Sequence, residues 1–352
     1  MAFEDRVNEL ADEVESADER AAEEARERHA VLAKPPGSLG RLEELGARLA
    51  GSAGECPPPV PGSPAVVISA GDHGVLARGV SPWPAEVTAA MVANFCAGGA
   101  AANALAKTAG ARVTVLDVGV ASELPRHPML RSAKVRAGTA DMSREPAMGR
   151  EEAARAVMAG SGVAEELVES GGVDLLVPGD MGIGNTTAAA ALVSVFSARP
   201  PAEVTGRGTG VDDETLKLKV RVIEEALALH EPDAGDPLGV LAAVGGLEHA
   251  ALAGLILTGA VYRIPVVLDG VSAVAAALAA RAFAVGSVDH MVAGHRSAEP
   301  GSGAGLESLG LSPVLDLELR LGEGTGGLLA VPVVQSAARV LSEMATLEEI
   351  GA

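Results

Sequence analysis

Short apolar runs rich in β-branched residues alternate with long segments rich in Ala, Leu and Val along most of the chain. The runs that we interpret as strands cover residues 65–69, 112–118, 173–177 and 264–268, with a further strand expected over 288–293. They are apolar throughout, as is typical of parallel strands that helices cover on both faces. The pattern therefore predicts an α/β fold with a doubly wound, mostly parallel sheet. A β/α barrel of similar length would show the same alternation.

The two ends of the chain differ from this central pattern. Residues 1–30 carry 11 acidic side chains against 4 arginines, and apolar residues recur there at helical spacing, which predicts an exposed amphipathic helix. A proline-rich stretch over 56–64 then interrupts any helix. We expect a small helical domain formed by residues 1–60, connector included, together with residues 330–352. Residues 61–329 would form the large α/β catalytic domain, with a Rossmann-like sheet.

The composition narrows the range of partners and compartments. A formal charge of −20, with no basic stripe, disfavours binding to nucleic acid. The two cysteines fit neither a disulfide framework nor a zinc pattern, and the first residues do not resemble a secretory leader, so we expect a cytoplasmic protein. Long, strongly apolar runs such as 250–261 and 271–280 are shorter than a membrane span.

Glycine-rich and polar residues directly follow the predicted strands, at 71–74, 179–187 and 269–270. In an open α/β sheet, ligands bind beyond the carboxyl ends of the strands, so these loops should meet in one crevice. The loop 179–187 matches neither a P-loop nor a dinucleotide fingerprint. Its amides could bind a phosphate and Asp180 could bind sugar hydroxyls. The alternative is a tight strand–helix turn capped by Asn185 or Thr186.

Other polar residues are candidates for chemistry. Glu323 stands between Gly322 and Gly324, where the backbone can approach a ligand closely, and a carboxylate in such a loop could abstract a proton. The alternative is a solvated turn. Lys217 and Lys219 lie near the start of a predicted helix, where an anionic partner is favourable, although such lysines are often only solvated. The histidines show no metal-ligand spacing, so we predict no metal site.

Six segments in this order resemble the nicotinate-nucleotide–dimethylbenzimidazole phosphoribosyltransferase family: residues 34–40, 71–75, 179–187, 268–270, 294–300 and 321–326. The resemblance covers almost the whole chain. It implies an enzyme of the lower-ligand branch of cobalamin synthesis. Such an enzyme moves 5-phosphoribose from nicotinate mononucleotide to 5,6-dimethylbenzimidazole, yielding α-ribazole 5′-phosphate and nicotinate with inversion at the anomeric carbon. It also implies a homodimer that requires no metal or prosthetic group.

The resemblance further implies roles for single residues. Glu323 matches the catalytic carboxylate, which accepts a proton from the attacking base. The remaining matches are substrate-binding residues: main chain at Gly182, Gly208 and Gly270 for the phosphate, Lys219 and Ser297 as side-chain donors to it, and Asp180 and Asp269 for the ribose and the reacting bases.

Three positions depart from the pattern expected of the family. Asp180 stands where glutamate is expected, Trp83 where a smaller aromatic residue is expected, and Ala85 where glutamine is common. Trp83 could stack on the benzimidazole or narrow its pocket. The identity of the acceptor therefore stays open, with another base or a phenol as an alternative. A different alternative for the function is a non-catalytic paralogue that binds nicotinate mononucleotide.

Overall fold

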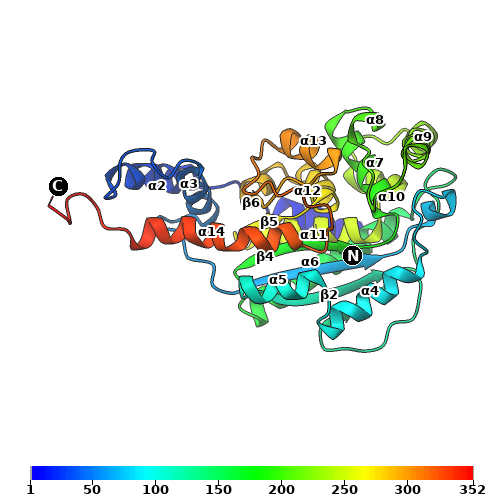
Figure 1. The fold of residues 1–352 in the computed structure, drawn as a ribbon, viewed down its shortest axis with the longest axis horizontal. Coiled ribbons are helices and arrows are strands. Elements are labelled where there is room, and N and C mark those ends of the chain that lie inside the picture. The colour runs from blue at the N-terminus through cyan, green and yellow to red at the C-terminus, as the bar shows by residue number, and fades with distance from the viewer. Residues whose placement is uncertain (1, 352) are drawn as a thin grey trace.

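The computed structural model describes residues 2–351, and within that range it contains a six-stranded sheet in the order β3-β2-β1-β4-β5-β6 (Figure 1). Every neighbouring pair is parallel. The strands are β1 (Pro64–Gly71), β2 (Arg112–Gly119), β3 (Leu130–Ser132), β4 (Leu175–Met181), β5 (Val266–Leu268) and β6 (Met291–Ala293). This order is that of a doubly wound Rossmann-type sheet, so the predicted fold class is confirmed and the barrel is excluded.

The strands are apolar throughout because both faces of the sheet are buried. Successive side chains of a strand point to opposite faces. In β1, Val67 packs into the core on the side of the helices α6 (Arg150–Glu165) and α11 (Leu247–Val261), whereas Val66 and Ile68 pack into a second core on the side of α14 (Thr325–Glu343). The two cores explain why the sequence shows no alternation of polar and apolar residues.

Helices cover each face of the sheet. One layer consists of α6, α11, α7 (Asn185–Ser197) and α12 (Val271–Phe283). The other layer consists of α14, α4 (Glu86–Ala97) and α5 (Ala101–Ala109). Around them lie α8 (Pro201–Val204), α9 (Asp213–His230), α10 (Pro237–Val244), α13 (Pro300–Leu309) and the short turns η1 (Gly74–Arg78), η2 (Glu166–Ser170) and η3 (Val285–His290).

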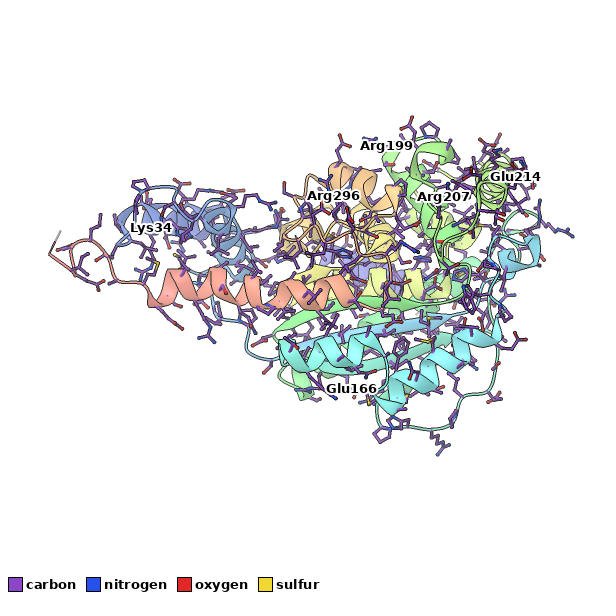
Figure 2. The ribbon with its side chains drawn as sticks, in the orientation of Figure 1. Lys34, Glu166, Arg199, Arg207, Glu214 and Arg296 are labelled. Atoms are coloured by element: carbon purple, nitrogen blue, oxygen red, sulfur yellow. The ribbon has the colours of Figure 1, made fainter. Side chains whose placement is uncertain are left out.

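An arm extends beyond the sheet at one end of the molecule (Figure 1). It consists of α2 (Glu19–Val31), α3 (Arg41–Ala53) and the C-terminal turns of α14, which pack against each other. Lys34, which Figure 2 labels in this arm, pairs with Glu43 at 2.8 Å. Because α14 runs without a break from the sheet into the arm, the predicted domain boundary at residue 330 falls inside a helix.

The predicted elements differ from the observed ones mainly at their ends. The single N-terminal helix is two helices, because α1 (Phe3–Asp12) ends before α2 begins, and α1 packs on α6 of the main body. The strand expected over 288–293 is shorter, since residues up to His290 form η3. The strand β3 was not predicted, because its three residues are partly exposed.

One stretch, Glu86–Ala109, is long and apolar enough to cross a membrane by length and composition. It is not one helix, since α4 ends at Ala97 and α5 begins at Ala101. Neither helix approaches the roughly 20 residues that a span requires.

Candidate active site

The predicted loops meet at the carboxyl ends of β1 and β4, the two central strands of the sheet. From β1 the chain continues to β2 on one side, while β4 and β5 lie on the other, so a crevice opens where the strand order reverses. The loop after β4, the loop after β5 and the loop before α14 all lie at this edge, and residues of all three line one cavity. Of the predicted loops, 179–187 and 269–270 thus line one cavity, whereas residues 71–74 do not line it.

Glu323 adopts a backbone conformation that is unusual for a residue with a side chain. Its φ is 62°, and its neighbours Gly322 and Gly324 have φ values of 82° and 80°. Three consecutive left-handed residues turn the chain sharply just before α14, which only flanking glycines allow at low strain. The turn lies directly on β4, since a Cβ at Gly179 would be 2.8 Å from the carbonyl carbon of Glu323. The left-handed turn and the close packing orient the glutamate inward.

The Glu323 side chain is only 4% exposed, and its Oε2 is buried without a hydrogen-bond partner among the described residues. Burial raises the pKa of this carboxyl to about 7, and the charges of Asp180 and Asp269 act in the same direction. The backbone N–H of Ala102, at the start of α5, opposes the shift. A carboxyl with a pKa near neutrality can accept and return a proton at physiological pH.

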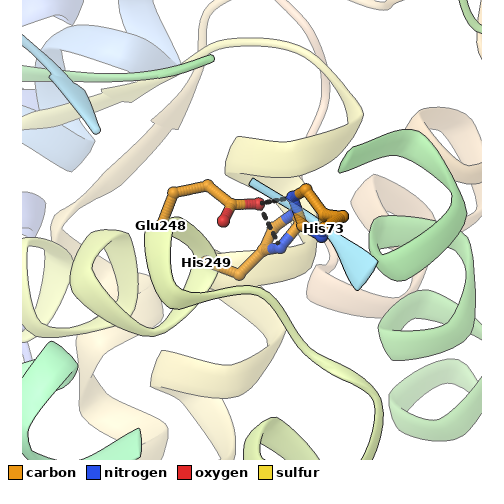
Figure 3. A group of neighbouring side chains, drawn as sticks. All are labelled: His73, Glu248 and His249. Atoms are coloured by element: carbon orange, nitrogen blue, oxygen red, sulfur yellow. Dashed lines mark ion pairs between the residues drawn. The ribbon is translucent and has the colours of Figure 1, made fainter. Parts of the chain in front are cut away.

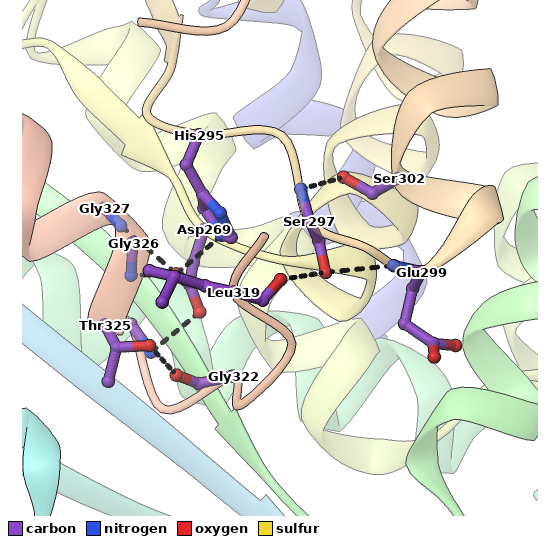
Figure 4. Close-up of polar contacts among 11 residues, drawn as sticks. Asp269, His295, Ser297, Glu299, Ser302, Leu319, Gly322, Thr325, Gly326 and Gly327 are labelled. Carbon is purple, nitrogen blue, oxygen red and sulfur yellow. Dashed lines mark hydrogen bonds and ion pairs between the residues drawn. The ribbon is translucent and has the colours of Figure 1, made fainter. Parts of the chain in front are cut away.

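Asp269, directly after β5, holds the loop that carries Glu323 (Figure 4). Its Oδ2 accepts the N–H of Gly324 at 2.9 Å, and its Oδ1 accepts the N–H groups of Gly326 and Gly327 at 2.7 and 3.1 Å. His295 Nε2 lies 3.3 Å from the same Oδ1. Both oxygens of Asp269 are thus engaged by the chain itself, at the N-terminus of α14, where a negative charge is favourable.

Asp180, at the end of β4, lies beside this loop. Burial raises the pKa of its carboxyl to about 6, a hydrogen bond from Ser272 opposes the shift, and the charge of Asp269 adds to it. Asn185 Nδ2 donates to its Oδ2. A Cβ at Gly322 would be 3.1 Å from Oδ1 of Asp180, so the loop leaves little space between them. Asp180 lines the cavity, and its role as a ligand of sugar hydroxyls stays a prediction.

The cavity has a volume of about 290 Å³. Its lining includes the predicted residues Asp180, Gly182, Gly208, Lys219, Gly270 and Ser297, so tertiary structure brings together all but three of the site residues named from the sequence. Glu323 is not part of the lining, although the preceding Leu321 and Gly322 are. Asp269 lies beneath the lining.

Lys219 is the buried cation of this cavity. It lies on α9, is 1% exposed, and its Nζ donates to Thr186 Oγ1 at 3.0 Å and to the carbonyl of Gly206 at 2.9 Å. Burial lowers the pKa of its ammonium group, and Glu299 opposes the shift. Lys217, two residues earlier, is exposed and pairs with Glu214. Of the two lysines, only Lys219 therefore lines the cavity.

Three charged residues of the cavity lining were not assigned from the sequence: Glu299, Arg320 and Arg207. Glu299 Oε1 accepts the N–H of Gly208 at 2.7 Å, and Arg320 donates to the carbonyl of Gly208 at 2.8 Å. Both line the cavity, and together they hold the loop that carries Gly208. Arg207, labelled in Figure 2, lines the same cavity. Glu299 and Arg320 are far from Gly208 in sequence, so no local pattern indicated these contacts.

The remaining predicted residues differ in their environment. Ser297 is buried, donates to the carbonyl of Leu319 at 3.0 Å, and accepts the N–H of Glu299 at 3.3 Å (Figure 4). Trp83 is 51% exposed and does not line this cavity, although the nearby Ser81 does. The stacking role that we expected for Trp83 therefore stays a prediction about a surface next to the cavity.

Comparisons with known proteins show the family of this chain. A family model described as phosphoribosyltransferase matches residues 14–351. Nicotinate-nucleotide–dimethylbenzimidazole phosphoribosyltransferase of Salinispora tropica is 57% identical, with 95% of each chain covered, and that of Chloroflexus aggregans is 55% identical, covering 95% of this chain and 94% of the relative.

Solved structures show the same fold. The crystal structure of CobT from Thermus thermophilus superposes with a TM-score of 0.92 at 51% identity, covering 95% of this chain and 99% of that one. A second structure from that organism, of nicotinate-nucleotide–dimethylbenzimidazole phosphoribosyltransferase, has a TM-score of 0.90 at 50% identity, covering 95% and 98%. With relatives above 50% identity over nearly their whole length, the chain belongs to the nicotinate-nucleotide–dimethylbenzimidazole phosphoribosyltransferases, a family of pentosyltransferases.

Proposed function

We propose that this protein transfers the 5-phosphoribosyl group of nicotinate mononucleotide to 5,6-dimethylbenzimidazole, releasing nicotinate and α-ribazole 5′-phosphate for cobalamin synthesis. The observation that carries the proposal is Glu323, a buried carboxylate with a pKa raised to about 7 in a strained loop beside the cavity. Such a group is suited to take a proton from a neutral heteroaromatic base near neutral pH.

The transfer is a single displacement at the anomeric carbon. One benzimidazole nitrogen attacks as the bond from that carbon to the nicotinate nitrogen breaks, and the bonding electron pair returns to the pyridine ring. The second benzimidazole nitrogen becomes acidic as positive charge develops on the ring, and Glu323 accepts its proton. The carboxylate also stabilises that charge. Attack opposite to the leaving group converts the β-nucleotide into an α-nucleotide.

The phosphate would lie against the loop after β4 and beside Lys219. Lys219 has one ammonium proton beyond the two that Thr186 and Gly206 receive, and Gly182, Gly270 and Ser297 line the same cavity. The N–H of Gly208 is engaged by Glu299, so Gly208 would contribute only after that contact shifts. We assign the ribose hydroxyls to Asp180. Asp269 would act on the reacting bases through the loop that it holds, because its oxygens accept backbone N–H groups.

We further propose a cytoplasmic homodimer that acts without a metal or prosthetic group and binds neither nucleic acid nor membrane. The arm formed by α2, α3 and the end of α14 extends away from the sheet, which suits a contact with a second copy (Figure 1). The formal charge of −20 disfavours nucleic acid. Light scattering of the purified protein would test the dimer.

The acceptor is tested by incubating the protein with nicotinate mononucleotide and a mixture of bases, and by identifying the products by mass spectrometry. We expect α-ribazole 5′-phosphate as the main product. Faster turnover of adenine or a phenol would reject dimethylbenzimidazole as the acceptor. Binding of nicotinate mononucleotide without release of nicotinate in the presence of any base would instead favour a non-catalytic sensor.

A further inference from the structure

Three ionisable side chains form a buried cluster behind the loop that follows β4 (Figure 3). Glu248, in the first turn of α11, points its Oε1 toward two imidazoles: His73 Nε2 at 2.8 Å and His249 Nδ1 at 2.9 Å. All three side chains are at most 1% exposed. The chemistry proposed above uses none of them.

Two histidines and a carboxylate are also a zinc ligand set, and their ligand atoms lie within 4.8 Å of one another. The distances favour direct ion pairs instead. Ligands of a tetrahedral zinc ion, with bonds of about 2.0 Å, would be separated by about 3.3 Å, which is longer than the 2.8 and 2.9 Å observed here. The surroundings are also closed: a Cβ at Gly246 would be 2.4 Å from Glu248 Oε1. The cluster is thus a packed group of ion-pair contacts.

His73 and Glu248 shift each other's pKa values. Burial alone would lower the pKa of His73 and raise that of Glu248, but their mutual attraction reverses both, so the pKa of His73 is raised and that of Glu248 lowered. Each member of the pair therefore stabilises the charged form of the other. A buried ion pair of this kind is strongly destabilised when only one partner is removed.

His73 connects this pair to the wall of the substrate cavity. A Cβ at Gly182 would be 3.2 Å from His73 Nε2, and a Cβ at Gly184 would be 3.3 Å from His73 Cβ, so the side chain of His73 lies directly against both glycines. Gly182 and Gly184 line the cavity. The carbonyl of Gly182 also accepts the N–H of Asn185, the first residue of α7. Any displacement of His73 would move this part of the wall.

We propose that the ion pair of His73 and Glu248 positions the Gly182–Gly184 loop for binding of the ribose phosphate, which makes both side chains positioning residues. The inference rests on the function proposed above. It concerns nucleotide binding alone, because the loop that carries Glu323 is held separately by Asp269. Loss of the pair should therefore affect the KM for the nucleotide rather than kcat.

The test is Glu248→Gln, which keeps the shape of the side chain and removes its charge. We expect the KM for nicotinate mononucleotide to rise about tenfold, with kcat changed less than about threefold and the KM for the base unchanged. The double variant His73→Gln/Glu248→Gln should recover most of the KM, because no charge is then left unpaired and the two amides can hydrogen-bond.

The matched control is His290→Gln. His290 is an equally buried histidine, bonded to Ser52 Oγ at 2.8 Å and to the carbonyl of Glu15 at 3.0 Å, and it is not part of the cavity lining. The control should lower the Tm and leave every KM unchanged. If Glu248→Gln lowers the Tm in the same way and also leaves KM unchanged, the pair is merely structural and the proposal fails. A stoichiometric metal in the wild-type protein that is lost in Glu248→Gln would equally overturn it.

If Glu248→Gln does not fold, His73→Gln decides, since it breaks the same pair from the other side. A rise of about tenfold in the same KM is expected, and an unchanged KM would reject the proposal. Failure of the proposed function is distinct, because the wild-type protein would then release no nicotinate at all, whereas the present inference predicts a difference between active variants.

Discussion

Asp269 binds the backbone on the C-terminal side of Glu323: its Oδ2 accepts the N–H of Gly324, the next residue, at 2.9 Å. The carboxylate of Asp269 thus fixes the turn that carries the carboxylate of Glu323. The two acidic groups also interact electrostatically, because the charge of Asp269 contributes to the raised pKa of Glu323. Asp269 therefore affects both the conformation of the loop and the pKa of the Glu323 carboxyl that the loop carries.

Asp269→Asn should weaken this turn, because the amide presents N–H groups toward backbone N–H groups that need an acceptor. We expect a loss of about 1–3 kcal/mol in the free energy of unfolding and a clear decrease in kcat. Asp174→Asn is the control: Asp174 accepts the N–H groups of Gly62 and Ser63, both at 2.8 Å, before β4. It should lower stability without lowering kcat, so equal kcat values for the two variants would contradict the role of Asp269.

Glu323→Gln should retain binding of nicotinate mononucleotide and lose roughly 100-fold or more in turnover, because only the proton acceptor is removed. Binding is measured by calorimetry and turnover by release of nicotinate. Glu318→Gln serves as the control, since Glu318 is an exposed glutamate of the same segment that also has a positive φ of 57°. Full turnover in Glu323→Gln would remove this residue from the mechanism.

The pH dependence of the reaction should follow the ionisation of Glu323. Since the carboxylate form is the base and its pKa is raised to about 7, kcat/KM should increase with pH and level off above about pH 7. The residual activity of Glu323→Gln should lack this step, which separates ionisation of the enzyme from that of the substrates. A wild-type profile that stays flat from acidic to mildly alkaline pH would contradict the assignment.

Glu323→Gln should also make the folded protein more stable at alkaline pH. The folded state raises the pKa of Glu323 from 4.5 to about 7, so it binds the proton more tightly than the unfolded state does, and stability is lost as pH rises through that interval. At about pH 8 the variant should gain on the order of 3 kcal/mol, at about 1.36 kcal/mol per pKa unit. Urea titrations at pH values above and below the two pKa values of Glu323 measure this effect. A gain in stability of the same size below pH 4.5 would show that it does not come from the ionisation of Glu323.

Lys219→Met should weaken binding of the phosphate specifically. We expect the KM for nicotinate mononucleotide to rise about 10- to 100-fold, as for loss of a charge-assisted hydrogen bond. The KM for nicotinate riboside, which lacks the phosphate, should be unchanged. Lys217→Met, at an exposed lysine of the same helix, should leave both values unchanged. Equal effects on the two substrates in Lys219→Met would place the phosphate elsewhere.

The sequence by itself determined the sheet, the loops at its carboxyl edge and the candidate for the catalytic carboxylate. These features are encoded locally, since apolar runs mark buried strands and glycines on both sides of Glu323 permit its left-handed turn. The predicted strands and helices differ from the observed ones mainly at their ends. At η3, for example, residues up to His290 form a helical turn where a strand was predicted.

Only the tertiary structure decided the contacts that give these residues their properties. Asp269 lies 55 residues from Gly324, and Glu299 lies 91 residues from Gly208, yet each pair shares a hydrogen bond. The raised pKa of Glu323, the choice of Lys219 over Lys217 and the pairing of His73 with Glu248 all depend on burial. Burial and charge proximity arise from chain segments that fold against one another, and no local pattern of residues encodes them.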